Sequence, residues 1–153
     1  MLAVGDRLPD FSGHDVDGHR VDTSVLAGRP LVLFFYPKAN SLGCTREARA
    51  FAEHRERFER RGARVVGVSV DAADAQRAFA ERCRLPYSLI SDSTGELARR
   101  FGVLGAFGLA RRVTFVVDAA GRIRHVTESL LPATHVKEAL IAVEELGTGA
   151  AQI

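Results

Sequence analysis

The chain alternates short, continuously apolar runs with longer segments in which apolar residues recur at helical spacing. Runs that stay apolar throughout predict strands buried on both faces, whereas helical spacing predicts helices with one buried side. The predicted strands are Leu31–Tyr36, Val65–Val70, Tyr87–Ile90, Val113–Val117 and Ile123–Glu128. The predicted helices are Thr45–Arg61, Ala73–Cys83, Thr94–Phe101 and Pro132–Leu146.

The order of these elements predicts an α/β fold. A strand, a helix and a strand in succession favour parallel pairing with a right-handed crossover, and the turn at Ala119–Gly121 adds an antiparallel hairpin. The turn at Asp17-Gly18 predicts an N-terminal β-hairpin over Phe11–Val21. No repeat or linker divides the chain, so we expect one domain over residues 1–153, with a central mixed β-sheet flanked by helices. The pattern alone does not separate a thioredoxin-like fold from other α/β folds.

Charge gives no sign of a nucleic-acid partner or a membrane. The net charge is +2, and the arginines of residues 55–64 alternate with glutamates, which predicts a solvated, ion-paired helix face. No apolar run approaches the roughly 18 residues that span a bilayer. Residues 1–10 lack the basic and apolar regions of a signal peptide, and the two cysteines do not form a CxxC pair. We therefore expect a cytoplasmic protein in a reducing compartment.

Cys44 is the candidate reactive residue, because it lies between a buried strand and the start of a helix. The free N–H groups and the dipole of a helix N-terminus stabilise an anion, and the thiolate is the reactive form of cysteine. Ser41 can add a hydroxyl, Gly43 permits close approach of the backbone, and Pro37 can exclude water from one side. A lone cysteine is also often a small buried apolar residue, and these cues alone leave both interpretations open.

The spacing Pro37-x3-Ser41-x2-Cys44 resembles the active-site motif of peroxiredoxins, in which Thr or Ser occupies the middle position. The wider string from Phe35 to Phe51 is similar to the bacterioferritin comigratory protein (PrxQ-type) branch of that family. Three further blocks of the same branch occur in the same order: Val4-Gly5-Asp6 with Pro9-Asp10-Phe11, Leu85-Pro86-Tyr87 with Leu89-Ile90-Ser91-Asp92, and Arg112 to Asp118. The resemblance covers most of the chain and implies a thioredoxin-like fold.

The resemblance implies a thiol-dependent peroxidase that reduces hydrogen peroxide and organic hydroperoxides. Cys44 would attack the peroxide and become a sulfenic acid. Ser41 would hydrogen-bond the peroxide or the thiolate, and the backbone N–H groups of Cys44 and Gly43 would contribute further donors. Pro37 would be a wall of the site. We expect no cofactor and no metal ion, since none of the five histidines falls in the motif or in a pair with metal-ligand spacing.

An arginine and a glutamate complete the set that the resemblance implies. From its position, Arg112 is a surface arginine at the end of a strand; the family places an arginine there beside the thiolate, where its guanidinium donates several hydrogen bonds. Arg111 would point to the other face of the strand. Glu47 is either a favourable acid in the first helical turn or, as the family implies, the carboxylate that orients Arg112.

The chain departs from the family at the second cysteine. Arg49 occupies the position of the resolving cysteine that many PrxQ-type proteins carry, and Leu42 replaces a proline. Cys83 is a candidate resolving residue, although relatives with a cysteine on that helix align it nearer Ala80; an apolar packing role is the alternative. We therefore expect a one-cysteine cycle, in which thioredoxin, glutaredoxin or a low-molecular-weight thiol attacks the sulfenate.

Two other functions remain to be weighed. A disulfide reductase on the same fold needs Cys-x-x-Cys, and residue 47 is glutamate. A redox-sensing or chaperone-like protein could use Cys44 as a switch without sustained turnover, since a sensor also needs an accessible thiolate. The resemblance favours an enzyme that is a monomer or a weak homodimer.

Overall fold

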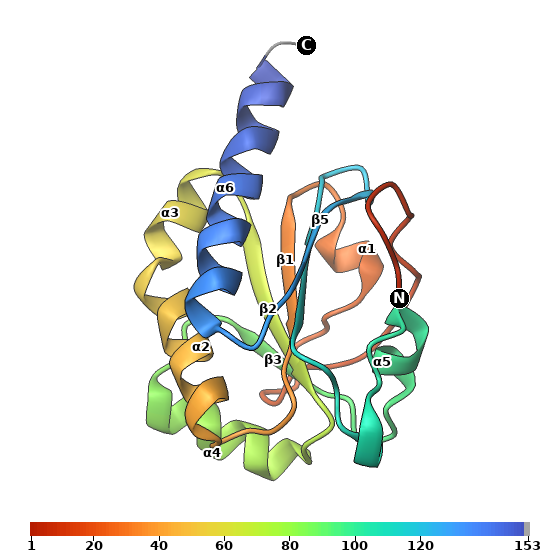
Figure 1. Ribbon diagram of the computed structural model, residues 1–153, viewed down its shortest axis with the longest axis vertical. Helices are drawn as coiled ribbons and strands as arrows, with labels where there is room; N and C mark the ends of the chain where they lie inside the picture. The colour runs from red at the N-terminus through yellow and green to blue at the C-terminus, as the bar shows by residue number, and fades with distance from the viewer. Residues whose placement is uncertain (152–153) are drawn as a thin grey trace.

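A five-stranded mixed sheet forms the centre of the computed structural model, which describes the backbone of residues 1–151 and the side chains of residues 1–146 (Figure 1). The strands are β1 (Leu31–Phe35), β2 (Arg64–Ser69), β3 (Ser88–Ser91), β4 (Val113–Val117) and β5 (Ile123–Glu128). Their order is β3-β2-β1-β4-β5. β1, β2 and β3 are parallel, whereas β4 is antiparallel to β1 and β5 is antiparallel to β4. The predicted mixed sheet is therefore confirmed.

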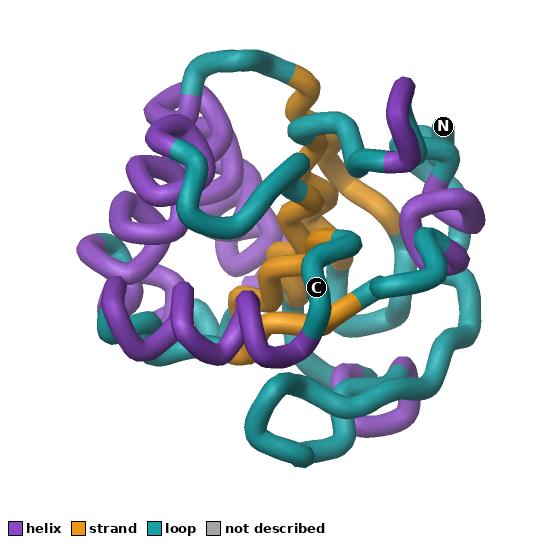
Figure 2. The backbone as a smooth tube through the Cα atoms, turned by 90° about the horizontal axis from the view of Figure 1, so that it is seen from below, coloured by secondary structure: helices purple, strands orange, loops and turns teal. Residues whose placement is uncertain are grey.

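Helices cover both faces of this sheet. They are α1 (Thr23–Leu26), α2 (Leu42–Glu53), α3 (Arg55–Arg60), α4 (Ala73–Cys83), α5 (Glu96–Phe101), the 3-10 turn η1 (Ala106–Gly108) and α6 (Pro132–Ala151). α2, α3, α4 and α6 pack on one face, and the shorter α1 and α5 pack on the other (Figure 1). Seen from below, most helical turns gather on one side of the strands (Figure 2). None of the described helices combines the length and the apolar character needed to cross a bilayer.

β1 holds the two layers together. All five of its residues are buried, and consecutive side chains point to opposite faces. Phe34 stacks on Phe51 of α2 with ring centroids 4.6 Å apart, while Phe35 contacts Phe101 of α5 at 5.1 Å. Because β1 is packed from both sides, its carboxyl end is a rigid support for the loop that follows and for the start of α2.

The predicted helix Thr45–Arg61 is wrong in two respects. It begins earlier, at Leu42, and it is two helices that meet at His54. His54 leaves the helical conformation, with φ −99° and ψ 12°, and its ring Nδ1 lies 2.8 Å from the carbonyl oxygen of Ala50. The side chain thus occupies a carbonyl of the last turn of α2, and the chain changes direction into α3.

The predicted N-terminal β-hairpin is reduced to one isolated antiparallel bridge between His14 and Arg20. The turn between them includes Gly18, which has a φ of +87° and so adopts the left-handed conformation that glycine tolerates. Asp15 forms a second bridge, to Ile90 of β3. The segment therefore folds back as predicted, but it lies along the edge of the main sheet instead of forming a pair of regular strands.

Candidate active site

Cys44 lies in the first turn of α2, directly beyond the carboxyl end of β1. Ser41 is the N-cap: its hydroxyl accepts a hydrogen bond from the N–H of Cys44 at 3.3 Å and donates one to the carbonyl of Lys38 at 2.9 Å. Cys44 is only 1% exposed. It thus lies almost completely buried at the helix end that favours an anion.

Arg112 lies immediately before β4 and its guanidinium reaches Cys44. Its Nη2 donates to Cys44 Sγ at 3.2 Å, although the two residues are 68 positions apart in the chain. The antiparallel register of β1 and β4 pairs Phe35 with Val113, which brings the start of β4 to the end of β1. A Cβ atom at Gly43 would lie 3.1 Å from Arg112 Nη2, so a glycine at this position lets the guanidinium approach α2.

Glu47 binds the other end of the same guanidinium. Arg112 Nη1 donates to Glu47 Oε1 at 2.7 Å, and the Glu47 side chain is completely buried. Burial raises the pKa of Glu47 to about 7, against the opposing effect of Arg112. Burial of Arg112 lowers its pKa, but the charges of Glu47 and Cys44 outweigh this and raise it overall, so the guanidinium remains positive.

His135 and Thr114 extend this cluster into the protein, and neither was among the sequence candidates. The imidazole Nδ1 of His135 lies 2.8 Å from Thr114 Oγ1 and 3.5 Å from Glu47 Oε2, and Nε2 lies 2.6 Å from the carbonyl of Ser129. Both side chains are buried. The available signal was the phase of α6, since His135 falls on the face that also buries Ala139 and Leu140.

The sequence of the chain matches a known protein family. Residues 4–126 match the model of the AhpC/TSA family. The chain belongs to this family. A relative from Triticum aestivum, named peroxiredoxin Q, chloroplastic, is 37% identical over 148 residues, covering 95% of this chain and 68% of the relative. The chain thus spans about two thirds of the length of curated plant relatives.

Solved structures of similar proteins agree with the fold. Peroxidoxin BcpB from Mycobacterium tuberculosis superposes with a TM-score of 0.89 at 37% identity, covering 95% of this chain and 98% of that one. Peroxiredoxin Q from Xanthomonas campestris gives a TM-score of 0.84 at 26% identity, covering 90% and 91%. The predicted resemblance to the PrxQ-type branch and its thioredoxin-like fold is confirmed.

Some of the remaining sequence candidates lie near Cys44, and others lie away from it. Pro37 is partly buried in the loop between β1 and α2. Arg111 is exposed and pairs with Glu128 at the surface, whereas its neighbour Arg112 reaches Cys44. Cys83 is the last residue of α4; it is partly buried and packs against the same apolar cluster that contains Cys44. Both cysteines are free thiols.

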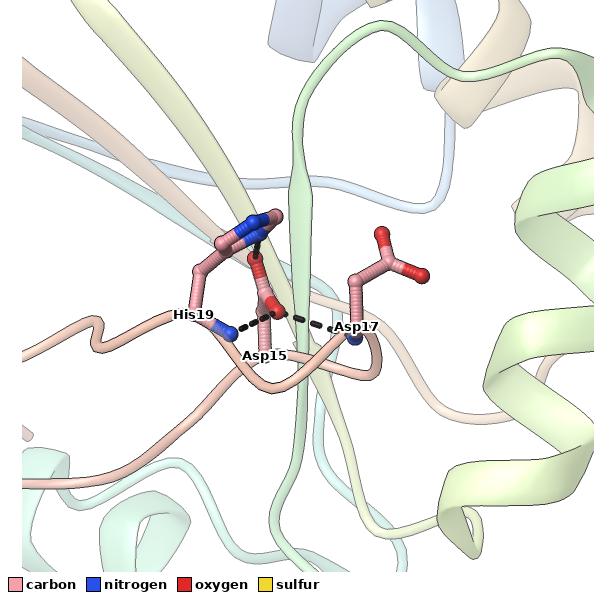
Figure 3. Close-up of side chains that lie close together, drawn as sticks. All are labelled: Asp15, Asp17 and His19. Atoms are coloured by element: carbon pink, nitrogen blue, oxygen red, sulfur yellow. Dashed lines mark hydrogen bonds and ion pairs between the residues drawn. The ribbon is translucent and has the colours of Figure 1, made fainter.

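Asp15, Asp17 and His19 are the described residues closest to a metal-ligand arrangement, with candidate ligand atoms within 4.8 Å of one another (Figure 3). Both carboxylate oxygens of Asp15 already accept hydrogen bonds. Oδ1 accepts from the N–H groups of Asp17 and His19, both at 2.9 Å, and Oδ2 accepts from Ser88 Oγ at 3.1 Å. The carboxylate therefore closes the turn beside β3, and we assign no metal to the cluster.

Glu47 should make stability depend on pH. Because the folded protein raises its pKa from 4.5 to about 7, this group stabilises the fold fully below pH 4.5, and that contribution is lost as pH rises through about 7. The contribution is on the order of 3 kcal/mol. Glu47→Gln cannot ionise, so it should lose less stability than the wild type between about pH 5 and pH 8 in urea unfolding. Equal losses in the two proteins would contradict the buried, titrating carboxyl.

Proposed function

We propose that this protein is a thiol-dependent peroxidase that reduces hydrogen peroxide and organic hydroperoxides with Cys44 as its nucleophile. The observation that carries the proposal is the contact of Arg112 Nη2 with Cys44 Sγ at 3.2 Å, made at the N-terminal turn of α2. A positive guanidinium and a helix N-terminus both stabilise the thiolate over the thiol. Membership of the AhpC/TSA family supports the same activity.

The oxidative step uses the groups already described. The Cys44 thiolate attacks the terminal oxygen of R–O–O–H, the S–O bond forms, and the O–O bond breaks. The bonding electron pair leaves with RO⁻, which takes a proton from water and departs as ROH; Cys44 is left as a sulfenic acid. In this proposal Arg112 stabilises charge as it moves from sulfur to the leaving oxygen, and the N-terminal N–H groups of α2 add donors. Ser41 supports this arrangement as the N-cap.

The reductive half of the proposed cycle uses an external thiol. One thiol R′SH attacks the sulfur of the sulfenic acid and releases water, and a second R′SH then frees Cys44 and leaves R′S–SR′. Arg49 stands where a neighbouring resolving cysteine would be, and Cys83 ends α4 with only part of its side chain exposed. These positions favour a one-cysteine cycle with thioredoxin, glutaredoxin or a low-molecular-weight thiol as reductant.

The remaining features of the proposal concern the environment of the enzyme. We propose that the enzyme is cytoplasmic, where a pool of reduced thiols converts oxidised Cys44 back to its thiol form. We further propose that it is a single domain and that it is a monomer or a weak homodimer. Fractionation of cells with an antibody to the chain tests the location, and sedimentation over a range of concentrations tests the assembly. A chloroplast location is in the name of the Triticum aestivum relative and is said only of that protein.

Mass spectrometry after one equivalent of hydrogen peroxide, with a sulfenic-acid trap present, tests the proposal on wild type and Cys83→Ser. We expect a trapped adduct on Cys44 in both proteins, because in the proposed one-cysteine cycle Cys83 does not react with the oxidised sulfur. A Cys44–Cys83 disulfide in the wild type would replace the one-cysteine cycle by a two-cysteine cycle. Unmodified Cys44 in both proteins would overturn the peroxidase, and a single oxidation that no thiol reverses would favour a sensor.

A further inference from the structure

Glu47 uses only one of its two oxygens in the cluster at Cys44. Oε1 accepts from Arg112 Nη1 at 2.7 Å, whereas Oε2 is buried and has no hydrogen-bond partner among the described residues. A buried polar atom without a partner is costly, and more so when it carries negative charge. His135 Nδ1, on α6, lies 3.5 Å from Oε2.

The surroundings of His135 determine which ring nitrogen holds its proton. Nε2 lies 2.6 Å from the carbonyl oxygen of Ser129, which can only accept, so Nε2 must be the donor. In the neutral ring Nδ1 is then a lone-pair acceptor. It lies 2.8 Å from the hydroxyl of Thr114, which donates to it, and it faces Glu47 Oε2. A proton on Oε2 would turn that 3.5 Å contact into a hydrogen bond after a movement of about 0.5 Å.

We propose that His135 is a positioning residue of the active site: its Nδ1 accepts a hydrogen bond from the carboxyl O–H of protonated Glu47, so that α6 controls the charge of the carboxyl that holds Arg112 against Cys44. While Glu47 is ionised, the hydroxyl of Thr114 donates a hydrogen bond to His135 Nδ1. When Glu47 takes up a proton, its carboxyl O–H replaces Thr114 as the donor to Nδ1. The inference deepens the proposed peroxidase function and rests on it for its biological meaning, but its test requires no turnover.

The charged groups around the pair are consistent with a neutral ring. Arg112 donates to Glu47 and also to Cys44, which lies on the same helix as Glu47. The hydroxyl of Tyr87 is a further titratable neighbour of Glu47. Burial lowers the pKa of His135 and the positive Arg112 lowers it further, against the hydrogen bond to Ser129 and the charge of Glu138. Burial raises the pKa of Glu47 to about 7, so it is Glu47 that exchanges a proton near neutral pH.

The proton on Glu47 matters because Cys44 and Glu47 share one cation. With both ionised, two negative groups compete for Arg112 in a buried site; with Glu47 neutral, the guanidinium charge acts on the thiolate alone. The two titrations are therefore coupled. A residue that stabilises the protonated carboxyl consequently favours the thiolate, although it touches neither sulfur nor peroxide.

Nitrogen NMR of histidine-labelled protein tests the contact directly. We expect His135 to show a protonated Nε2 and an unprotonated Nδ1, with an Nδ1 shift that changes through an inflection near pH 7 as Glu47 takes up its proton. In Glu47→Gln the inflection should vanish, because the amide cannot titrate. An inflection that persists in Glu47→Gln, or a wild-type Nδ1 shift that is constant with pH, would overturn the proposal.

Two substitutions of His135 separate positioning through Glu47 from support of the Ser129 carbonyl. Asparagine keeps a polar group near Nδ1 and loses the one at Nε2, whereas glutamine does the reverse. In the Cys83→Ser background, the rate of Cys44 alkylation by iodoacetamide is measured against pH. His135→Gln should move the inflection due to Glu47 downward by about 0.5 to 1 unit, since the neutral acid loses its acceptor. His135→Asn should keep it within about 0.2 units.

The exposed His14 provides the matched control, because His14→Asn should leave the alkylation profile as in the parent. A shift in both His135 variants, or in neither, would overturn the positioning role. Because alkylation reports the thiolate and requires no peroxide, these outcomes are independent of whether the protein turns over. Failure of the peroxidase proposal would appear instead as an unmodified Cys44 in the experiment with hydrogen peroxide.

Discussion

Cys44→Ser should abolish peroxide reduction, with a loss of at least about 10³-fold in the rate of thiol-dependent hydrogen peroxide consumption. The reaction needs an anionic nucleophile, and Cys44 Sγ lies 3.2 Å from the cationic Arg112 Nη2 in the N-terminal turn of α2, where an anion is favoured. A serine hydroxyl stays protonated under the same influences, and the group nearest to it is the cationic Arg112, which is no base. The variant should fold, because a hydroxyl can still accept from Arg112.

Cys83→Ser is the matched control, since it removes the second thiol at the end of α4 and leaves the Cys44 cluster unchanged. Its rate with an external thiol should stay within about twofold of the wild type. Retention of more than about a tenth of the activity in Cys44→Ser would contradict the assigned nucleophile. A large loss of activity in Cys83→Ser would instead mean that Cys83 takes part in the catalytic cycle.

The strands and the helix α4 were predicted to within one residue at each end, and the larger errors have physical reasons. β4 and β5 have the predicted bounds, because a continuous apolar run and its turn specify burial locally. The break between α2 and α3 falls at His54, whose backbone leaves the helical conformation while its ring contacts the carbonyl of Ala50, and no periodicity reports such a local deviation. α1 was not predicted at all; its four residues depend on the cap by Asp22 and on packing of Leu26.

Some residues of the site are neighbours in the sequence, whereas others come from distant positions, and only the first kind could be predicted from local spacing. One loop and the helix start that follows it contain Ser41, Gly43 and Cys44. Their spacing alone therefore made Cys44 a candidate for a reactive thiolate. Arg112 lies 68 positions from Cys44 and was identified only through the family resemblance, since its placement depends on the register of β4 against β1. His135 carried no motif: its importance depends on α6 packing over Glu47, which only the three-dimensional arrangement reveals.

Arg112→Leu should lower kcat/KM for hydrogen peroxide by about 10²- to 10³-fold, the effect expected for removing a charged donor from a developing anion. The guanidinium has two roles here: Nη2 holds the Cys44 sulfur and Nη1 binds the buried Glu47. Without it the thiolate loses its cation, and Glu47 remains in an apolar pocket where only the protonated form is tolerated. The fraction of thiolate, measured by absorbance near 240 nm against pH, should therefore fall near neutral pH.

Arg111→Leu is the control that makes this result specific to geometry, since the adjacent arginine has the same charge but pairs with Glu128 at the surface. It should change kcat/KM by less than about twofold, because exposed ion pairs contribute little. The kcat/KM of Arg112→Lys should lie between those of Arg111→Leu and Arg112→Leu. An ammonium ion keeps the charge, but it lacks the planar fork that binds Cys44 and Glu47 at once. Equal losses in Arg111→Leu and Arg112→Leu would mean that net positive charge, and not the guanidinium contact at 3.2 Å, supports the reaction.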